Sequence, residues 1–335
     1  MKRFLIHQMP FYYVFIILIT SCGATYFYTT FRNSAQKEVA LQSASTEPPM
    51  CSMEVKRLKG YKFVKPLMFV DNPCESEHFM SLKDKLSTII ESYKTAGKLQ
   101  SASLYLKEFG TNDWLCINEN EKYSPGSLLK VPELITLLKM NELDPGFLNK
   151  RVVYAHPFTS DKTPVFLAKS IKVGQAYSVR ELLTYMISYS DNNATQLLNT
   201  VLDVKLFKKV FNDFGLAEPN WSANDYPISV RDYSLFIRAI YNASYLSIED
   251  SEYAAELLSK CNFDKGMANV MPSTIKMAHK FGEAGTDKVK QLHETAILYV
   301  GEKTYVFTIM TKSDNLSTLP DVIKSLSTEV FKQLN

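Results

Sequence analysis

The spacing of apolar residues predicts two groups of strands separated by a helical region. Helical spacing covers residues 76–94 and returns in the last segment, 321–334. Short apolar runs predict strands at 101–109 and 113–118, and three more strand-like runs lie between about 277 and 310. We therefore expect a mixed α/β fold, more narrowly α+β, in which an antiparallel sheet flanked by helices stands beside an all-helical lobe. A cleft between sheet and lobe would hold the site.

An apolar run from about residue 9 to residue 31 follows Lys2 and Arg3 and contains no charged residue. Its length suits a bilayer span, and the positive start predicts an N-terminus inside and a domain outside the cytoplasm of a bacterial cell. We favour an uncleaved anchor over residues 1–32, because the aromatic residues 26–28 suit a membrane interface. Two alternatives stay open: lipidation of Cys22, which ends a lipobox-like Ile-Thr-Ser-Cys string, and a cleaved secretory signal.

The rest of the chain divides into a tether and lead-in, residues 33–75, and one domain, residues 76–335. The tether is rich in Ser, Ala, Glu and Gln, a composition typical of a spacer. Its last part is more apolar and could add a strand to the domain. A domain of this size does not need disulfides, so we assign none, although three pairings are open to the four cysteines that follow the anchor: Cys51, Cys74, Cys116 and Cys261.

Charge and motif content exclude several classes of function. The net charge is only +3 and the lysines are dispersed, so we expect no nucleic-acid partner. The sequence contains no phosphate-binding loop and no dinucleotide fingerprint. Its five histidines show no metal-ligand spacing. We therefore expect no metal and no cofactor, and we interpret the histidines as ordinary surface or core residues.

Three short strings carry the candidate chemistry. A lysine one helical turn after a serine can take the serine's proton, which an isolated hydroxyl does not release near neutral pH. A second serine with an asparagine can relay a proton and hold a substrate amide, and a lysine on a strand edge can bind a substrate carboxylate. In chain order the strings are Ser127-Leu-Leu-Lys130, Ser190-Asp191-Asn192 and Lys280-Phe281-Gly282.

Each string recurs elsewhere, so local context has to select the copy. Ser127 follows a Ser-Pro-Gly turn and precedes an apolar helical face, and Pro132 is tolerated only near a helix start. The simpler alternatives are a helix cap for Ser127 and a solvated surface position for Lys280. We set aside the other copies, which begin at Ser34, Lys172, Ser273 and Ser313.

The set and its order resemble the penicillin-recognising serine enzymes, the class A β-lactamases and penicillin-binding proteins, whose strings are S-x-x-K, S-D-N and K-T-G. The resemblance spans roughly residues 77–335. It implies that Ser127 attacks a carbonyl with Lys130 as base, while Ser190 relays a proton to the leaving nitrogen. Phe281 departs from the pattern, because the family usually has a hydroxyl residue there.

The resemblance also implies a set of substrate-binding residues. Asn192 would hold the substrate amide, and Lys280 and Gly282 would belong to the strand that binds the substrate. The backbone amides of Ser127 and Glu283 would form an oxyanion hole. Burial and the charge of Lys280 would lower the pKa of Lys130. A supporting role for His279 or His293 stays open, because the two residues flank the third string.

Deacylation is a second point of departure. Class A β-lactamases carry a Glu-Pro-x-x-Asn loop after the second string, and its glutamate activates the water that frees the acyl group. Here Glu218 precedes a proline, but it comes early in the chain, and Ser222 stands where the asparagine would be. Glu218 is therefore a candidate base on sequence alone, with a helix-end residue as the simpler interpretation.

These inferences predict an envelope-facing serine acyl-transfer hydrolase that acts on β-lactams or related cell-wall peptides through an acyl-enzyme at Ser127. The alternative is a non-catalytic or slowly deacylating penicillin-binding-type protein that binds cell-wall fragments or a partner. Either way the expected partners are a small-molecule or peptide substrate and, through residues 1–32, the bacterial cell membrane.

Overall fold

The computed structural model describes residues 23, 25–30, 51–158, 165–166, 169–220 and 226–334, and it divides the chain into two units, residues 1–52 and 53–335. In the first unit residues 25–30 are helical. Most of the predicted anchor, Cys22 included, and the whole of the tether up to residue 49 lie outside the described residues. Among the described helices, none is long and apolar enough to cross a membrane.

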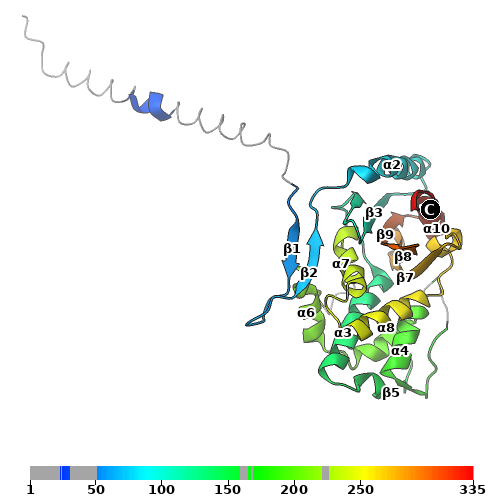
Figure 1. Cartoon of the computed structure of the whole chain (residues 1–335). Coiled ribbons are helices and arrows are strands. Elements are labelled where there is room, and N and C mark those ends of the chain that lie inside the picture. The colour runs from blue at the N-terminus through cyan, green and yellow to red at the C-terminus, as the bar shows by residue number, and fades with distance from the viewer. Residues whose placement is uncertain are drawn as a thin grey trace, which may run out of the picture. The chain divides into compact units, whose positions relative to one another are not determined.

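A five-stranded antiparallel sheet forms the centre of the second unit, in the order β4-β3-β9-β8-β7 (Figure 1). β9 joins the hairpin of β3 and β4 to the other two C-terminal strands, β8 and β7, and Ser101 of β3 lies opposite Lys312 of β9. β7, which carries the third string, is an edge strand of this sheet. The strands are β3 (Ser101–Glu108), β4 (Trp114–Ile117), β7 (Ile275–Gly285), β8 (Lys290–Val300) and β9 (Lys303–Ser313).

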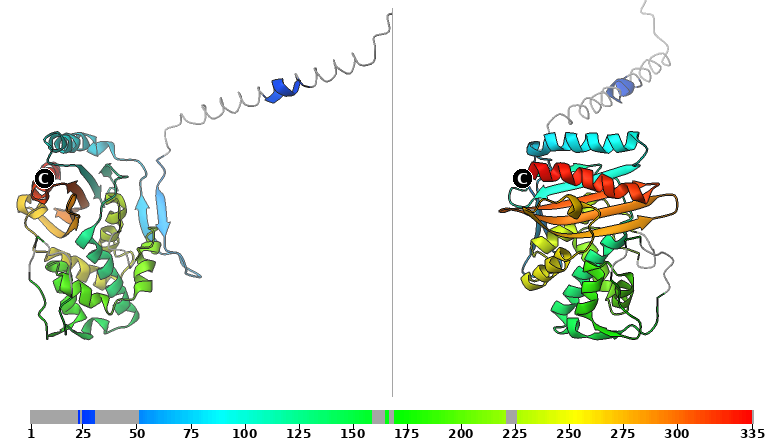
Figure 2. Two further views of the ribbon diagram at one scale, coloured as in Figure 1. Left: turned by 180° about the vertical axis from the view of Figure 1, so that it is seen from behind. Right: turned by 90° about the vertical axis from the view of Figure 1, so that its right-hand side faces the viewer.

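One face of the sheet packs against two helices, α2 (Met80–Thr95) and α10 (Leu319–Leu334), and a 3-10 turn, η1 (Glu77–Phe79), leads into the first of them (Figure 2). Side chains on β9 alternate between the two cores: Phe307 faces these helices and Val306 faces the other side. Since both faces of the strand are buried, it reads as an almost continuous apolar run in the sequence.

The opposite face of the sheet supports the helical lobe. α7 (Val230–Tyr241) packs against β3, β8 and β9, and α8 (Ile248–Ser259) packs against β7. The lobe consists of α3 (Lys130–Leu143), α4 (Val179–Ser188), α5 (Asn192–Asn199) and α6 (Val204–Asp213). The remaining short elements are η2 (Gly126–Leu129), η3 (Phe147–Asn149), β5 (Arg151–Val153), β6 (Ala176–Ser178), α9 (Met267–Val270) and η4 (Leu316–Thr318).

Within the second unit a separate hairpin, β1 (Glu54–Arg57) and β2 (Leu67–Asp71), packs beside the central sheet and the helical lobe. The ring of Phe69 meets the edge of Phe214 at a centroid distance of 6.0 Å. Asp71 accepts hydrogen bonds from Arg238 at 2.6 Å and from Lys107 at 3.2 Å. The lead-in before residue 76, which we expected to add one strand, therefore adds two. An aromatic contact and the ion pairs of Asp71 hold them in place.

The structure confirms the predicted fold class and corrects one prediction. The helix expected at 76–94 is η1 followed by α2, and the strands expected at 101–109 and 113–118 are β3 and β4. Cys51 and Cys74 are disulfide-bonded, although the sequence supported no bridge, because spacing along the chain does not reveal which thiols are close in space. Cys116 and Cys261 are free.

Candidate active site

Ser127 lies in the 3-10 turn η2, which runs directly into α3. Pro132 is the third residue of α3, where the missing amide hydrogen would have had no partner within the helix. The capping positions of η2 and α3 belong to Pro125 and Leu129, so the helix-cap alternative for Ser127 is wrong. Lys130 follows Ser127 by one turn and is only 4% exposed.

Two glycines let this turn lie directly against β7. A Cβ atom added to Gly126 would lie 2.1 Å from the carbonyl oxygen of Glu283, and one added to Gly282 would lie 2.4 Å from that of Pro125. Gly126 also has a φ of +53°, in the region that favours glycine. The packing brings the backbone near Ser127 close to the backbone at Glu283. It is compatible with an oxyanion hole made of these two amides, which stays a prediction.

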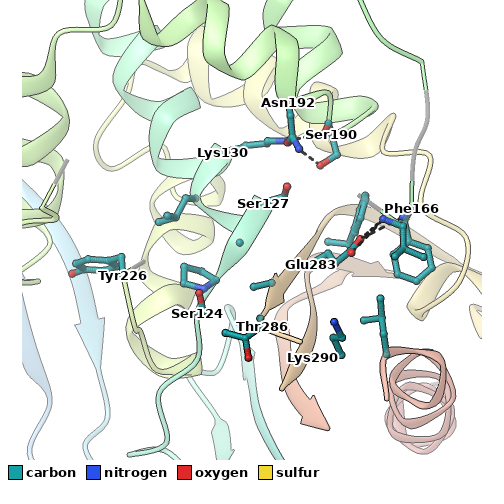
Figure 3. Close-up of a pocket in the computed structure, with 18 of the residues that line it drawn as sticks. Ser124, Ser127, Lys130, Phe166, Ser190, Asn192, Tyr226, Glu283, Thr286 and Lys290 are labelled. Atoms are coloured by element: carbon teal, nitrogen blue, oxygen red, sulfur yellow. Dashed lines mark hydrogen bonds between the residues drawn. The ribbon is translucent and has the colours of Figure 1, made fainter. Parts of the chain in front are cut away.

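The loop between α4 and α5 presents Ser190 in a strained conformation, with a φ of +55°. Asp191 holds this loop in place. Its carboxylate accepts hydrogen bonds from the Asn193 amide at 3.0 Å, the Ile171 amide at 2.9 Å and the Ser170 hydroxyl at 2.8 Å. The middle residue of the second string is thus structural, and its neighbours face the site (Figure 3).

Two lysines from distant parts of the chain converge on Ser190. Nζ of Lys130 donates to the carbonyl oxygen of Ser190 at 2.7 Å, to its Oγ at 3.3 Å and to Oδ1 of Asn192 at 2.8 Å. Nζ of Lys280 donates to the same Oγ at 2.8 Å and to the carbonyl oxygen of Phe281 at 2.9 Å. In Figure 3 the hydroxyl of Ser127 points toward Ser190 and Asn192. The three strings therefore meet in space.

Burial and charge act together on these amines. Burial first, and then the charge of Lys280, hold the pKa of Lys130 well below its ordinary value of 10.5, while Glu133 and Asp191 oppose the shift. Burial also lowers the pKa of Lys280 to about 8, against the opposing influence of Cys261 and Glu294. A depressed pKa makes neutral Lys130 available to accept a proton near physiological pH.

A pocket of about 830 Å³ opens beside these residues. Of the predicted site residues, those that line it are Ser127, Lys130, Ser190, Asn192 and Glu283. Lys280 is fully buried and bonds to Ser190, so the surface-lysine alternative for it is wrong. Gly282 packs against the turn at Pro125. Among the described residues that line the pocket, the lysines are Lys130 and Lys290 (Figure 3), and the sequence did not single out Lys290.

Phe281 belongs to an aromatic cluster at the edge of this pocket. It stacks on Phe263 at a centroid distance of 4.2 Å and meets Phe166 edge to face at 6.2 Å. The residue thus replaces a hydroxyl with apolar packing and offers no hydrogen bond to a substrate. Glu283 contributes more than its amide, since its carboxylate accepts hydrogen bonds from the backbone amides of Val165 at 3.0 Å and Phe166 at 3.4 Å.

Glu218 does not face the pocket. It is exposed just beyond α6, where the Asn212 side chain donates to its Oε1 at 2.6 Å and Lys208 lies 3.7 Å from its Oε2. The simpler interpretation, a residue near a helix end, describes it. The described acidic residues that do line the pocket include Glu133, which follows Lys130 by one turn on α3. Glu133 was not identified from the sequence. The feature that could have identified it is an acidic side chain within the apolar run that follows Lys130.

Both histidines that flank the third string are buried parts of the sheet. His279 pairs through Nδ1 with Oε1 of Glu294 at 2.7 Å. His293 donates from Nε2 to the carbonyl oxygen of Ser124 at 2.9 Å, and its Nδ1 accepts from the Thr311 amide at 3.2 Å. Within the described part of the chain, no group of three or more His, Cys, Asp or Glu side chains could hold a metal ion.

The neutral state of His293 predicts acid sensitivity. Burial lowers its pKa from 6.5 to about 4, so between these values the unfolded chain binds a proton that the folded chain does not. Stability should therefore fall as the pH drops from 6.5 to 4, by about 3 kcal/mol from this residue. Denaturant unfolding at a series of pH values measures the slope. His293→Gln should reduce it and the exposed control His78→Gln should not; equal slopes in all three proteins would contradict the assignment.

The fold is β-lactamase/transpeptidase-like, because an antiparallel sheet stands beside a helical lobe. The site fits this class, since one serine lies in the turn that leads into a helix and two lysines surround a second serine. The chain belongs to the beta-lactamase enzyme family, whose family model matches residues 81–334. No curated protein matches the sequence closely enough to be reported.

Solved structures of this fold are similar to the chain at low sequence identity. A beta-lactamase from Chitinophaga pinensis matches with a TM-score of 0.64 and 18% identity, over 76% of this chain and all of that one. A PBP-A mutant solved as an acyl-enzyme complex with penicillin G matches with a TM-score of 0.62 and 18% identity, over 75% of this chain and 96% of that one. A class A beta-lactamase from Mycobacterium abscessus matches with a TM-score of 0.61 and 16% identity, over 75% of this chain and 98% of that one. At these identities the likeness shows the fold.

Proposed function

We propose that this protein is a serine hydrolase that forms an acyl-enzyme at Ser127 with β-lactams or with related peptides of the cell-wall stem. The observation that carries the proposal is the hydroxyl of Ser190, held between the buried amines of Lys130 and Lys280 at the wall of a pocket that Ser127 also lines. A binding cleft alone has no need of a nucleophile beside an amine whose pKa is depressed.

The proposed acylation follows from this geometry. Neutral Lys130 takes the proton of Ser127 as Oγ bonds to the substrate carbonyl carbon, and the amides of Ser127 and Glu283 stabilise the oxyanion. When the C–N bond breaks, the leaving nitrogen receives a proton from Ser190, which is replenished by the protonated amine of Lys130 at 3.3 Å. Lys280 donates to the other side of Ser190, and Asn192, which lines the pocket, would hold the substrate amide.

The PBP-A acyl-enzyme with penicillin G supports the choice of ligand, because a protein of the same fold forms that adduct. The position of Phe281 favours substrates whose carboxylate is bound elsewhere in the pocket. We further propose that residues 1–32 attach the enzyme to the bacterial cell membrane and place its catalytic unit outside the cytoplasm. The disulfide-bonded state of Cys51 and Cys74 supports an oxidising compartment.

The test is the intact mass of the protein during incubation with benzylpenicillin, with the modified peptide mapped. We expect an adduct on Ser127. An adduct that disappears as hydrolysed drug accumulates indicates a β-lactamase, and one that persists indicates a penicillin-binding-type protein. No adduct, or an adduct elsewhere, would contradict the proposal. The same experiment on spheroplasts with a membrane-impermeant penicillin conjugate tests the location, since only an extracytoplasmic site would be labelled.

A further inference from the structure

Glu133 is a buried carboxyl group that the acylation steps leave unused. It lies one helical turn after Lys130 on α3, is 8% exposed and lines the pocket. Its Oε2 has no hydrogen-bond partner among the described residues. An unpaired buried carboxylate oxygen is costly, and water is the usual partner of such an atom. Because Glu133 also lines the pocket, a water molecule in the pocket can approach its carboxyl group.

Glu133 and Lys130 influence each other's protonation. Residues three apart on a helix are neighbours on its surface. Burial raises the pKa of Glu133 to about 8, with Lys130 acting in the opposite direction, and burial lowers the pKa of Lys130. Because burial shifts the two pKa values toward each other, it lowers the cost of passing a proton from Glu133 to Lys130. The pair can serve as amine and acid, or as ammonium and carboxylate.

The other acidic residues of the described pocket wall are engaged or exposed. The carboxylate of Glu283 accepts the backbone amides of Val165 and Phe166. Asp287 is fully exposed on its side chain and lies 3.8 Å from Lys290. Asp314 is exposed and accepts a hydrogen bond from the Ser313 hydroxyl. Of these carboxyl groups, only Glu133 adjoins Lys130 on α3.

We propose that Glu133 is the general base that frees the acyl group from Ser127, a role that rests on the proposed function. Acylation leaves the pair as amine and acid, and transfer of the Glu133 proton to Lys130 converts it to carboxylate and ammonium. The Glu133 carboxylate then takes one proton from water, and the water oxygen bonds to the acyl carbonyl carbon. As the bond between that carbon and Oγ of Ser127 breaks, Oγ receives a proton from the ammonium of Lys130. The pair is then again amine and acid, the state in which acylation begins, so that one water is consumed and a free acid is released.

The test is a time course of intact mass with benzylpenicillin for the wild-type chain and three variants. Glu133→Gln preserves shape and removes the base, so it should acylate within about tenfold of the wild-type rate but release the acyl group at least about 100-fold more slowly. Glu133→Asp should restore part of the release. The matched control is Glu218→Gln, whose carboxylate is exposed outside the pocket, and it should behave as the wild type.

The pH profile separates a base from a merely structural residue. Wild-type release should rise with pH as Glu133 loses its proton, and this limb should be absent in Glu133→Gln. Release from Glu133→Gln at the wild-type rate would overturn the proposal, and so would equal impairment of both steps with no recovery in Glu133→Asp. A wild-type adduct that never clears would also overturn it while leaving the Ser127 acyl-enzyme standing. Absence of any adduct on the wild type would overturn both.

Discussion

Replacing Ser127 by Ala is expected to abolish the penicillin adduct and all turnover while leaving non-covalent binding in place. In the proposed mechanism the hydroxyl oxygen of Ser127 bonds to the substrate. We expect no substitute from Ser190, because its hydroxyl is held between two amines and accepts hydrogen bonds from both. The pocket wall changes by one oxygen atom only. Intact mass, drug hydrolysis and calorimetric titration of benzylpenicillin together measure the three quantities.

The matched control is Ser273→Ala. Ser273 opens a second Ser-x-x-Lys copy with the same spacing, but it is exposed and outside the pocket lining, so its variant should acylate like the wild type. A Ser127→Ala protein that still forms an adduct, or that behaves like the wild type in every assay, would reject Ser127 as nucleophile. Loss of binding together with loss of the adduct would point instead to a disturbed turn at Gly126.

Replacing Lys130 by Met is expected to slow acylation of Ser127 by about 10²- to 10⁴-fold, the usual contribution of a general base. The substitution removes the amine proposed as the base for Ser127, and it also removes the donor that holds the Ser190 carbonyl and Asn192. In the wild type the fraction of neutral Lys130 grows with pH through its depressed pKa and levels off above it, so the acylation rate should rise with pH and then reach a plateau. That rise should be missing in the variant. Stopped-flow acylation across a pH series measures both effects.

Two further variants show what the lysine contributes. Lys130→Arg keeps a cation that cannot give up its proton, so it should be as slow as Lys130→Met if Lys130 acts as a base. Recovery of the rate in Lys130→Arg would mean that charge alone is required. The exposed Lys276, which belongs to the copy starting at Ser273, supplies the control Lys276→Met, and this protein should acylate at the wild-type rate.

The hydrophobic pattern predicted most helices and strands of the fold, because these elements depend mainly on residues close together in the chain. The period of α2 and α10 and the apolar runs of β7 to β9 were visible without a structure, since amphipathic patterns follow directly from helix and strand geometry. The turn at Asn315 was also predictable as a polar cap, and its side chain accepts the Ser317 amide at 3.0 Å. Residues 54–71 were harder, because a hairpin needs a partner surface before its strands are stable.

The candidate site was predicted as a list of residues rather than as a geometry. Ser127, Lys130, Ser190, Asn192 and Glu283 were all selected from the sequence, and the structure brings them to one pocket. The direction in which each side chain points was not predictable. Lys280 was expected to meet a substrate carboxylate, yet it is fully buried and donates to Ser190.

The sequence by itself determined the three strings, their order and the helical turn between Ser127 and Lys130, because i,i+3 spacing is a property of the helix alone. Only the tertiary structure decided which charges are buried. It places Glu218 outside the pocket lining, includes Glu133 in that lining and buries Lys280, which donates to Ser190. Burial depends on segments that are far apart in the chain, and burial sets the pKa of each group, so the chemistry of the site follows from packing that no local pattern records.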